Sequence, residues 1–223
     1  KADIANLPKT VTEEDFSKAE QDYGNNPKIN LLTGRLLYEH PDISLGANNY
    51  GFSISHVYNS ALIDRTEQFE MGMGKGWKLN IQQYVRKATA GENREIPYQY
   101  IDASGCTHLF EYSTTVLRKN VEMDIYTDTE GLDMTLMYPF RVEWDEYYAI
   151  KDAKNNYMLF NNSGQCVMMV SIPCEADERT VWEEVYQRKA NALVFEYSGG
   201  KLDKVYNQKN YKEDGEKTYL YFE

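Results

Sequence analysis

The stretch INLLTGRLLYEHPDISLGANNYGFSISHVYNS, residues 29–60, decides the fold class of this chain. Apolar and polar residues alternate along most of it, which is the period of a β-strand with one buried face. Thr33-Gly34 and the interval from Gly46 to Gly51 mark two turns, because glycine tolerates the positive φ that tight hairpins need. The residues expected on one face of the last strand are Phe52, Ile54, His56 and Tyr58.

Strand patterns joined by similar turns continue downstream. Each turn opens with aspartate, asparagine or serine, whose side chains bond to nearby backbone, and most contain a glycine. These turns are Asp102–Gly105, Asp128–Gly131, Asp152–Asn156, Asn161–Gly164 and Ser198–Gly200. We expect Trp77, Leu79 and Ile81 to point one way from a further strand, and residues 141–150 to form one uninterrupted strand. The sequence therefore predicts a mainly β protein, an antiparallel meander of hairpins that forms a sandwich or a curled, partly closed sheet.

Two segments depart from this pattern. Residues 1–27 are interpreted as an N-terminal arm with a short helix from about Thr12 to Tyr23, and residues 28–223 as a single β-rich domain. That domain has a possible division into 28–112 and 113–223. The charged segment 175–192 has apolar residues at helical spacing, which favours a short helix starting near Asp177 or Thr180; an irregular hairpin insertion is the alternative.

Composition excludes several classes of partner. The chain has 223 residues, 19 of them tyrosine, and a formal net charge of −11. Such an acidic chain repels phosphate backbones, so we expect no nucleic-acid binding. It lacks an apolar run of about 18 residues, so we expect no membrane insertion. Three cysteines (Cys106, Cys166 and Cys174) are typical of buried fillers and not of a disulfide framework, although one bridge stays open.

Few residues suggest catalysis or cofactor binding. Asp102, Ser104 and His108 contain the ingredients of a hydrolase triad, but the turn already explains the first two. Cys106 and His108 project from one strand face, yet a zinc site needs about four ligands. Glu143 and Asp145 are expected on one strand face, and a pair of carboxylates could serve a glycosidase. Most such pairs on a strand are simply solvated on its outer face. We therefore expect no catalytic residue, no metal and no cofactor.

Aromatic residues offer the best candidate binding site. Trp144, Tyr147 and Tyr148 lie close together in the sequence, and exposed rings of this kind stack on sugars. The alternative is that they belong to a hydrophobic core.

The opening stretch, followed by GMGKGWKLNIQQYV and YQYIDASGCTHLFEY, resembles the module that begins the Rhs/YD-repeat region of bacterial wall-associated and polymorphic-toxin proteins. Later segments, YMLFNNSGQCVMMV and NALVFEYSGGKLDKVYN, resemble degenerate YD-type units. The motif positions of this resemblance include Thr33, Gly34, Asp42, Tyr58, Asn59, Ser60, Gly76, Trp77, Asp102 and Gly105. Cys106 stands where the family often has a small residue, and segment 175–192 breaks the usual spacing.

This resemblance implies a non-enzymatic structural module of a large secreted or wall-associated bacterial protein. Its strands would join other Rhs/YD-repeat segments of the same polypeptide in a β-shell, which in several members encloses a C-terminal toxin. Since no signal peptide opens the chain and it ends in a strand pattern, we expect a fragment of a longer protein. The alternative function is a carbohydrate-binding module for cell-wall glycan.

Overall fold

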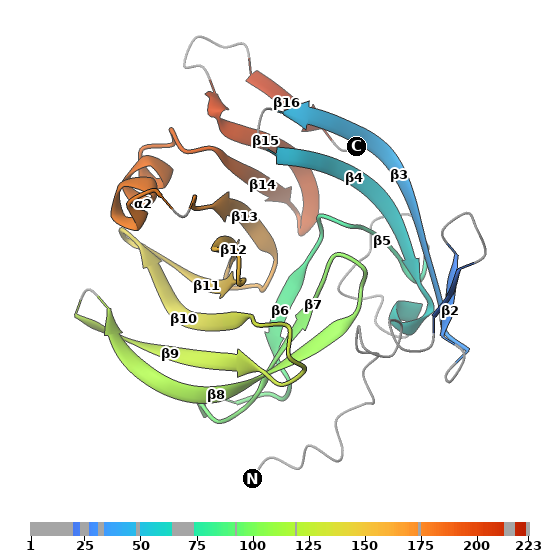
Figure 1. The fold of residues 1–223 in the computed structure, drawn as a ribbon, viewed down its shortest axis with the longest axis horizontal. Helices are drawn as coiled ribbons and strands as arrows, with labels where there is room; N and C mark the ends of the chain where they lie inside the picture. Colours follow the sequence, from blue (N-terminus) through green and yellow to red (C-terminus); the bar gives the residue numbers. More distant parts are fainter. Residues whose placement is uncertain are drawn as a thin grey trace. The chain divides into compact units, whose positions relative to one another are not determined.

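The computed structural model describes residues 20–22, 27–30, 34–47, 50–63, 74–91, 93–118, 120–173, 175–211 and 217–221. Its fold is mainly β, which confirms the predicted class, and its strands form two antiparallel sheets (Figure 1). The chain divides into two compact units. Unit 1 comprises Lys1–Tyr84 and Gln99–Leu109, and unit 2 comprises Val85–Tyr98 and Phe110–Glu223. The predicted domain boundaries stay a prediction.

A five-stranded sheet contains the stretch that opened the sequence analysis. Its strands, in spatial order, are β1 (Glu20–Asp22), β2 (Lys28–Asn30), β3 (Leu36–Ala47), β4 (Tyr50–Asn59) and β5 (Trp77–Leu79). Ile29 pairs with Leu36 across the first predicted hairpin, and Ala47 pairs with Tyr50 across the second. The second hairpin is therefore confirmed, and β2 and β3 pair as a hairpin requires, although most of the predicted turn at Thr33-Gly34 lies outside the described residues.

Three details of unit 1 differ from the prediction. Residues 20–22, expected at the end of a helix, form strand β1, because pairing with β2 outweighs a narrow apolar stripe; the rest of that helix lies outside the described residues. Strand β5 ends at Leu79, so Ile81 lies beyond it. On β4, Ile54 is buried on the face predicted to be apolar, and Val57 and Asn59 are buried on the opposite face. Both faces of the end of this strand therefore contain buried side chains.

The second sheet has eleven strands, and their spatial order from β16 to β6 follows the sequence without a crossover. Figure 1 shows the strands from β8 to β16 curling progressively, which selects the curled sheet over the sandwich. The strands are β6 (Tyr84–Lys87), β7 (Tyr98–Ile101), β8 (Thr107–Arg118), β9 (Val121–Asp128), β10 (Thr135–Val142), β11 (Asp145–Lys151), β12 (Asn156–Phe160), β13 (Cys166–Ser171), β14 (Ala192–Ser198), β15 (Lys201–Tyr211) and β16 (Lys217–Tyr221).

One α-helix of the described chain, α2 (Glu178–Tyr186), packs on this sheet within unit 2. The Asp177 side chain caps its first turn by accepting a hydrogen bond from the Arg179 amide, so the predicted helix and its start are confirmed. Trp182 and Val185 face a cluster of buried side chains that includes Phe140 and Tyr157. No helix in the described part of the chain is long and apolar enough to cross a membrane.

The predicted turn chemistry is confirmed in successive hairpins. Asp128, Asp152 and Asn161 each accept hydrogen bonds through Oδ1 from the backbone amides two and four residues later. Burial is the largest single effect on the Asp128 carboxyl and by itself would raise its pKa. Hydrogen bonds from the backbone amides of Glu130, Leu132 and Met134 together outweigh burial, so the pKa is lowered. A short polar side chain thus closes each of these three corners of the meander.

The expected strand over residues 141–150 is wrong. Val142 pairs with Asp145, so β10 and β11 are separate strands joined by a turn at Glu143-Trp144. Glu143 takes a positive φ of 53°, a conformation that glutamate rarely adopts. The sequence has no glycine at this position to indicate a turn. The turn places Trp144 at a hairpin tip, where its side chain is 90% exposed.

Candidate functional site

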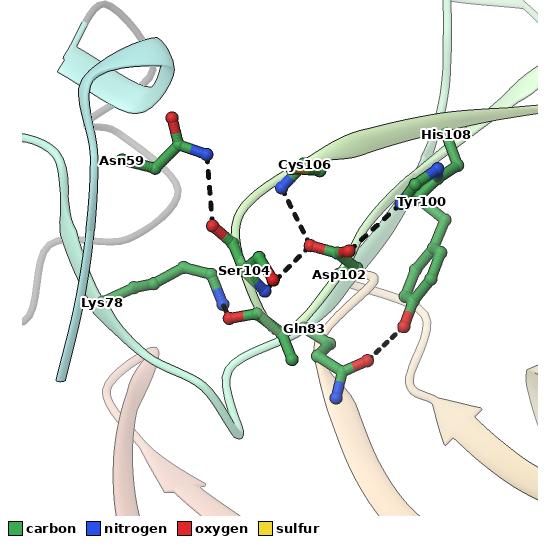
Figure 2. Close-up of polar contacts among 9 residues, drawn as sticks. Asn59, Lys78, Gln83, Tyr100, Asp102, Ser104, Cys106 and His108 are labelled. Carbon is green, nitrogen blue, oxygen red and sulfur yellow. Dashed lines mark hydrogen bonds and ion pairs between the residues drawn. The ribbon is translucent and has the colours of Figure 1, made fainter. Parts of the chain in front are cut away.

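The turn from Asp102 to Gly105 is the centre of a buried group of polar contacts in unit 1 (Figure 2). Asp102 Oδ1 accepts hydrogen bonds from the backbone amides of Ser104, at 2.9 Å, and Cys106, at 2.8 Å. The Gly105 amide donates to the Asp102 carbonyl at 3.1 Å. These bonds hold the loop as a compact corner between β7 and β8.

Lys78 reaches this corner from β5. Its side chain is fully buried, and its Nζ donates to the carbonyl oxygens of Ala103, Gln82 and Leu79 at 2.7, 3.1 and 3.2 Å. Burial lowers the lysine pKa to about 8, and electrostatic interactions with Asp102, Cys106 and Glu39 oppose that shift. The ammonium group thus joins the Ala103 carbonyl of the distant turn to two carbonyls of its own segment, those of Leu79 and Gln82.

Asn59 joins the end of β4 to the same corner. Its Nδ2 donates to the Ser104 carbonyl at 3.1 Å, and its Oδ1 accepts from the Ala61 amide at 2.9 Å. Its backbone amide donates to the Gly76 carbonyl at 2.9 Å. Asn59 is fully buried, so all these bonds form away from solvent, where an unmade bond is costly.

Two glycines allow these segments to approach closely. A Cβ on Gly105 would lie 2.7 Å from Leu62 Cδ1 and 3.3 Å from Asn59 Cβ. A Cβ on Gly76 would lie 2.9 Å from the Tyr58 ring and 3.2 Å from the Asn59 carbonyl. Both glycines also take a positive φ near 80°, so any side chain here meets strain and collision together.

The remaining members of the group extend along β7 and β8. His108 Nε2 lies 3.2 Å from Asp102 Oδ2, and the histidine is buried. The Tyr100 hydroxyl donates to Gln83 Oε1, and the Tyr100 and His108 rings lie 5.8 Å apart. We call the set Asn59, Lys78, Asp102, Gly105 and His108 the corner lock.

The corner lock does not have the arrangement of a hydrolase triad. Asp102 and His108 are in contact, as a triad requires, but the hydrogen bonds that tie Ser104 to the lock run through its backbone amide and carbonyl. Cys106 is a buried thiol outside any disulfide, and the described residues contain no group of three or more metal-ligating side chains that fits a metal ion. Most of the hydrogen bonds of the corner lock go to backbone groups.

Other residues of the sequence motif lie around the lock. The Trp77 ring packs on Tyr58 at 5.2 Å and on Tyr38 at 6.2 Å, and Ser60 Oγ accepts from the Leu36 amide at 2.9 Å. Gly34 takes a φ of 68° in the first hairpin, while Thr33 lies outside the described residues.

Asp42 sits at a break in register between β3 and β4, where its carboxylate contacts both His40 and His56. It therefore pairs two imidazoles on the strand surface and takes no part in the corner lock.

Sequence reasoning missed Lys78, Gln83 and Tyr100. Lys78 stands between Trp77 and Leu79, and the alternation of a strand assigns it outward. It is buried instead, because the turn that contains Ala103, 25 residues away, covers that face and adds its carbonyl to those of Leu79 and Gln82. No local signal marks such a residue.

The aromatic candidates do not form one platform. Tyr147 packs against the buried cluster beneath α2, and Tyr148 stacks on Tyr138 with ring centroids 4.2 Å apart. Trp144 projects from the hairpin tip. Glu143 lies in this turn and Asp145 begins β11, so the two are not a pair on one strand face.

The fold and the corner lock together define a protein built of β-hairpins, in which buried polar residues hold a turn in place by hydrogen bonds to its backbone. A family model described as "Domain of unknown function (DUF6531)" matches residues 26–110, which include every residue of the corner lock. No curated protein matches the chain, and no solved structure does.

Proposed function

We propose that the chain is a non-enzymatic structural module of a large secreted or wall-associated bacterial protein of the Rhs/YD-repeat type. One observation carries this proposal. Residues that the motif specifies at distant positions, Asn59, Gly76, Asp102 and Gly105, meet in one buried corner and bond to backbone there. A motif used in this way specifies the path of the chain.

The order of the strands supports the same proposal. Because neighbours in the eleven-stranded sheet are neighbours in sequence, each additional hairpin extends the curl by two strands. Further Rhs/YD-type hairpins of a longer polypeptide would add to β16 in this manner. A shell that encloses a C-terminal toxin or effector is the structure that such growth would build.

Two alanine substitutions test the structural role against the catalytic one. Asn59→Ala removes two side-chain bonds of the lock and is expected to lower the unfolding free energy by about 2 kcal/mol. Ser104→Ala keeps the backbone bonds and is expected to change stability by less than about 0.5 kcal/mol. Thermal and urea unfolding measure both. The proposal is contradicted if the wild type hydrolyses esters or wall glycans and Ser104→Ala abolishes that activity.

The alternative, a carbohydrate-binding module for wall glycan, now depends on Trp144 alone. Its exposed indole ring is accessible for stacking on a sugar, whereas Tyr147 and Tyr148 pack against other side chains. Tryptophan fluorescence titrated with cell-wall oligosaccharides, in wild type and in Trp144→Ala, checks this alternative.

A further inference from the structure

Two tyrosine rings lie face to face on neighbouring strands of unit 2. Tyr138 of β10 and Tyr148 of β11 have ring centroids 4.2 Å apart, and their ring planes differ by 19°. The register of the two strands shifts between Met137 and Phe140, which brings Tyr138 opposite Tyr148. The paired strands therefore hold the two rings in a stack.

Both rings of the stack keep some contact with solvent. Tyr138 and Tyr148 are each half-buried. Successive side chains of a strand point to opposite faces of the sheet, and Tyr147 packs against the buried cluster beneath α2. Tyr148 therefore lies on the face of β11 that does not contact this cluster.

Other tyrosine rings adjoin the stack at steeper angles. The ring of Tyr98, on β7, lies 5.5 Å from that of Tyr148 with an angle of 57° between the planes. Tyr98 in turn contacts Tyr126 at 4.8 Å and 81°, and Tyr126 contacts Tyr112 at 5.8 Å and 75°. The contacts of this row are therefore tilted or edge-on, in contrast to the parallel rings of Tyr138 and Tyr148.

We infer that Tyr138 and Tyr148 are a modification site, at which a metal-centred one-electron oxidant, such as an oxidised haem peroxidase, forms an intramolecular dityrosine. A phenol that loses one electron and its hydroxyl proton becomes a phenoxyl radical. Its unpaired electron occupies a π orbital, with large lobes on the carbons ortho to the oxygen and perpendicular to the ring. In the stack these lobes point at the neighbouring ring, which is the alignment that bond formation requires.

The edge-on pairs lack this alignment. At an angle of 81°, the π lobes of one ring meet the C–H edge of the other, as they do between Tyr98 and Tyr126. Coupling there requires that one buried ring first rotates, because Tyr98 and Tyr126 are both 2% exposed. The stacked pair is thus the favoured place for the bond.

The reaction balances as an oxidation by two electrons. Each tyrosine gives one electron to the oxidant and one proton to solvent, and the two radicals join through one new carbon–carbon bond between ortho carbons. The hydrogen on each of these carbons then leaves as a proton while a proton returns to each oxygen, so both phenols are restored. In total two electrons and two protons leave, and β10 becomes covalently joined to β11.

Coupling between separate chains is the competing reaction. Tyr186, whose side chain is 51% exposed, is available for it. That reaction needs the collision of two chains and slows on dilution, whereas the stacked rings of one chain are already in place. The dityrosine of Tyr138 and Tyr148 is therefore expected in the monomer and at a yield that does not depend on protein concentration.

The test oxidises the whole chain with tris(bipyridyl)ruthenium(III), generated by light and persulfate, and then isolates the monomer by gel filtration. The monomer of wild type is expected to show the blue fluorescence of dityrosine and to lose the mass of two hydrogen atoms. Cleavage by trypsin at Arg141 should leave peptides 120–141 and 142–151 joined.

Single phenylalanine variants locate the bond. Tyr138→Phe and Tyr148→Phe are each expected to lower the dityrosine yield of the monomer at least tenfold. Tyr147→Phe removes a hydroxyl from the same tryptic peptide but from the ring that packs beneath α2, so it is the matched control. Its yield is expected to stay within twofold of wild type. Circular dichroism verifies that each variant is folded.

Several outcomes would overturn the inference. One is a monomer without dityrosine after a dose of oxidant that consumes tyrosine. Another is dityrosine found only in covalent dimers, since that assigns the reaction to collisions between chains. A third is an undiminished yield in Tyr138→Phe or Tyr148→Phe, or a bond that maps to another pair such as Tyr98 and Tyr126.

Discussion

The corner lock of unit 1 and the core beneath α2 in unit 2 stabilise their surroundings by different means. The lock joins segments through hydrogen bonds to backbone, and two small apolar groups accompany it, Leu37 with Val57 and Cys106, and Leu62 with Ile101. The core beneath α2 gathers thirteen buried side chains, among them Phe140, Tyr157 and Trp182. Hydrogen bonds are directional, so they can fix the path of the backbone at a corner. A broad sheet face is stabilised by burial of apolar area, which aromatic rings provide.

The largest effect is expected from Trp182→Ala. Its ring contacts Phe140 and Tyr157 at centroid distances of 5.1 Å each, and its removal leaves a cavity in the core. We expect a loss of about 3–5 kcal/mol in the unfolding free energy. Trp144→Ala, at the exposed tip, is the matched control and should cost less than about 0.5 kcal/mol. Equal losses in chemical denaturation would show that the core beneath α2 does not carry stability as described.

Gly105→Ala is expected to cost about 2–4 kcal/mol, because its Cβ meets Leu62 in addition to the strain of a φ of 80°. Gly131→Ala has nearly the same φ, 81°, with nothing within 4 Å of the added carbon. It should cost only about 1–2 kcal/mol. Comparing the thermal unfolding of the two variants separates the effect of the Leu62 contact from that of backbone strain. Equal losses of stability would show that close approach at Gly105 does not contribute.

Asp102→Ala is expected to cost about 2–3 kcal/mol, since it removes two amide bonds and the contact with His108 from a largely buried site. Asp152→Ala removes the corresponding amide bonds in unit 2, at a turn with exposed central residues, and should cost about 1 kcal/mol. Urea unfolding compares the pair. A larger loss for Asp152→Ala would mean that the lock adds nothing to an ordinary turn.

The smallest effect is a dependence on pH. The pKa of Lys78 is lowered to about 8 in the folded chain from 10.5, so above pH 8 the unfolded chain binds more protons than the folded one. The contribution of Lys78 to stability therefore rises with pH between about 8 and 10.5. Between pH 7.5 and 9, the unfolding free energy of wild type minus that of Lys78→Met should increase by about 1 kcal/mol. A difference that stays flat would show that the amine titrates as it does in water.

The same contrast explains how much the sequence predicted. The turns at Asp102, Asp128, Asp152 and Asn161 and the start of α2 at Asp177 were predictable, because each depends on a side chain bonding to backbone within a few residues. The burial of Lys78 was not, because the turn that covers it, with Ala103 as its acceptor, lies 25 residues along the chain.

The Glu143-Trp144 turn was missed for a related reason. No glycine, asparagine or aspartate stands at its positive φ, and the cross-strand pairing of Val142 with Asp145 imposes the turn on the sequence. Thus Trp144 was a candidate from its residue type, whereas its exposed position at a tip became evident only from the fold.

The repeated turn has a practical consequence. In the hairpins at Asp152 and Asn161, the bonding atoms belong to the first, third and fifth residues, and the second residue, Ala153 or Asn162, is exposed. A cysteine introduced at either place would accept a spin or fluorescence label without disturbing the bonds beside it. Each of these two corners thus offers a site for a reporter whose signal follows the opening of one hairpin.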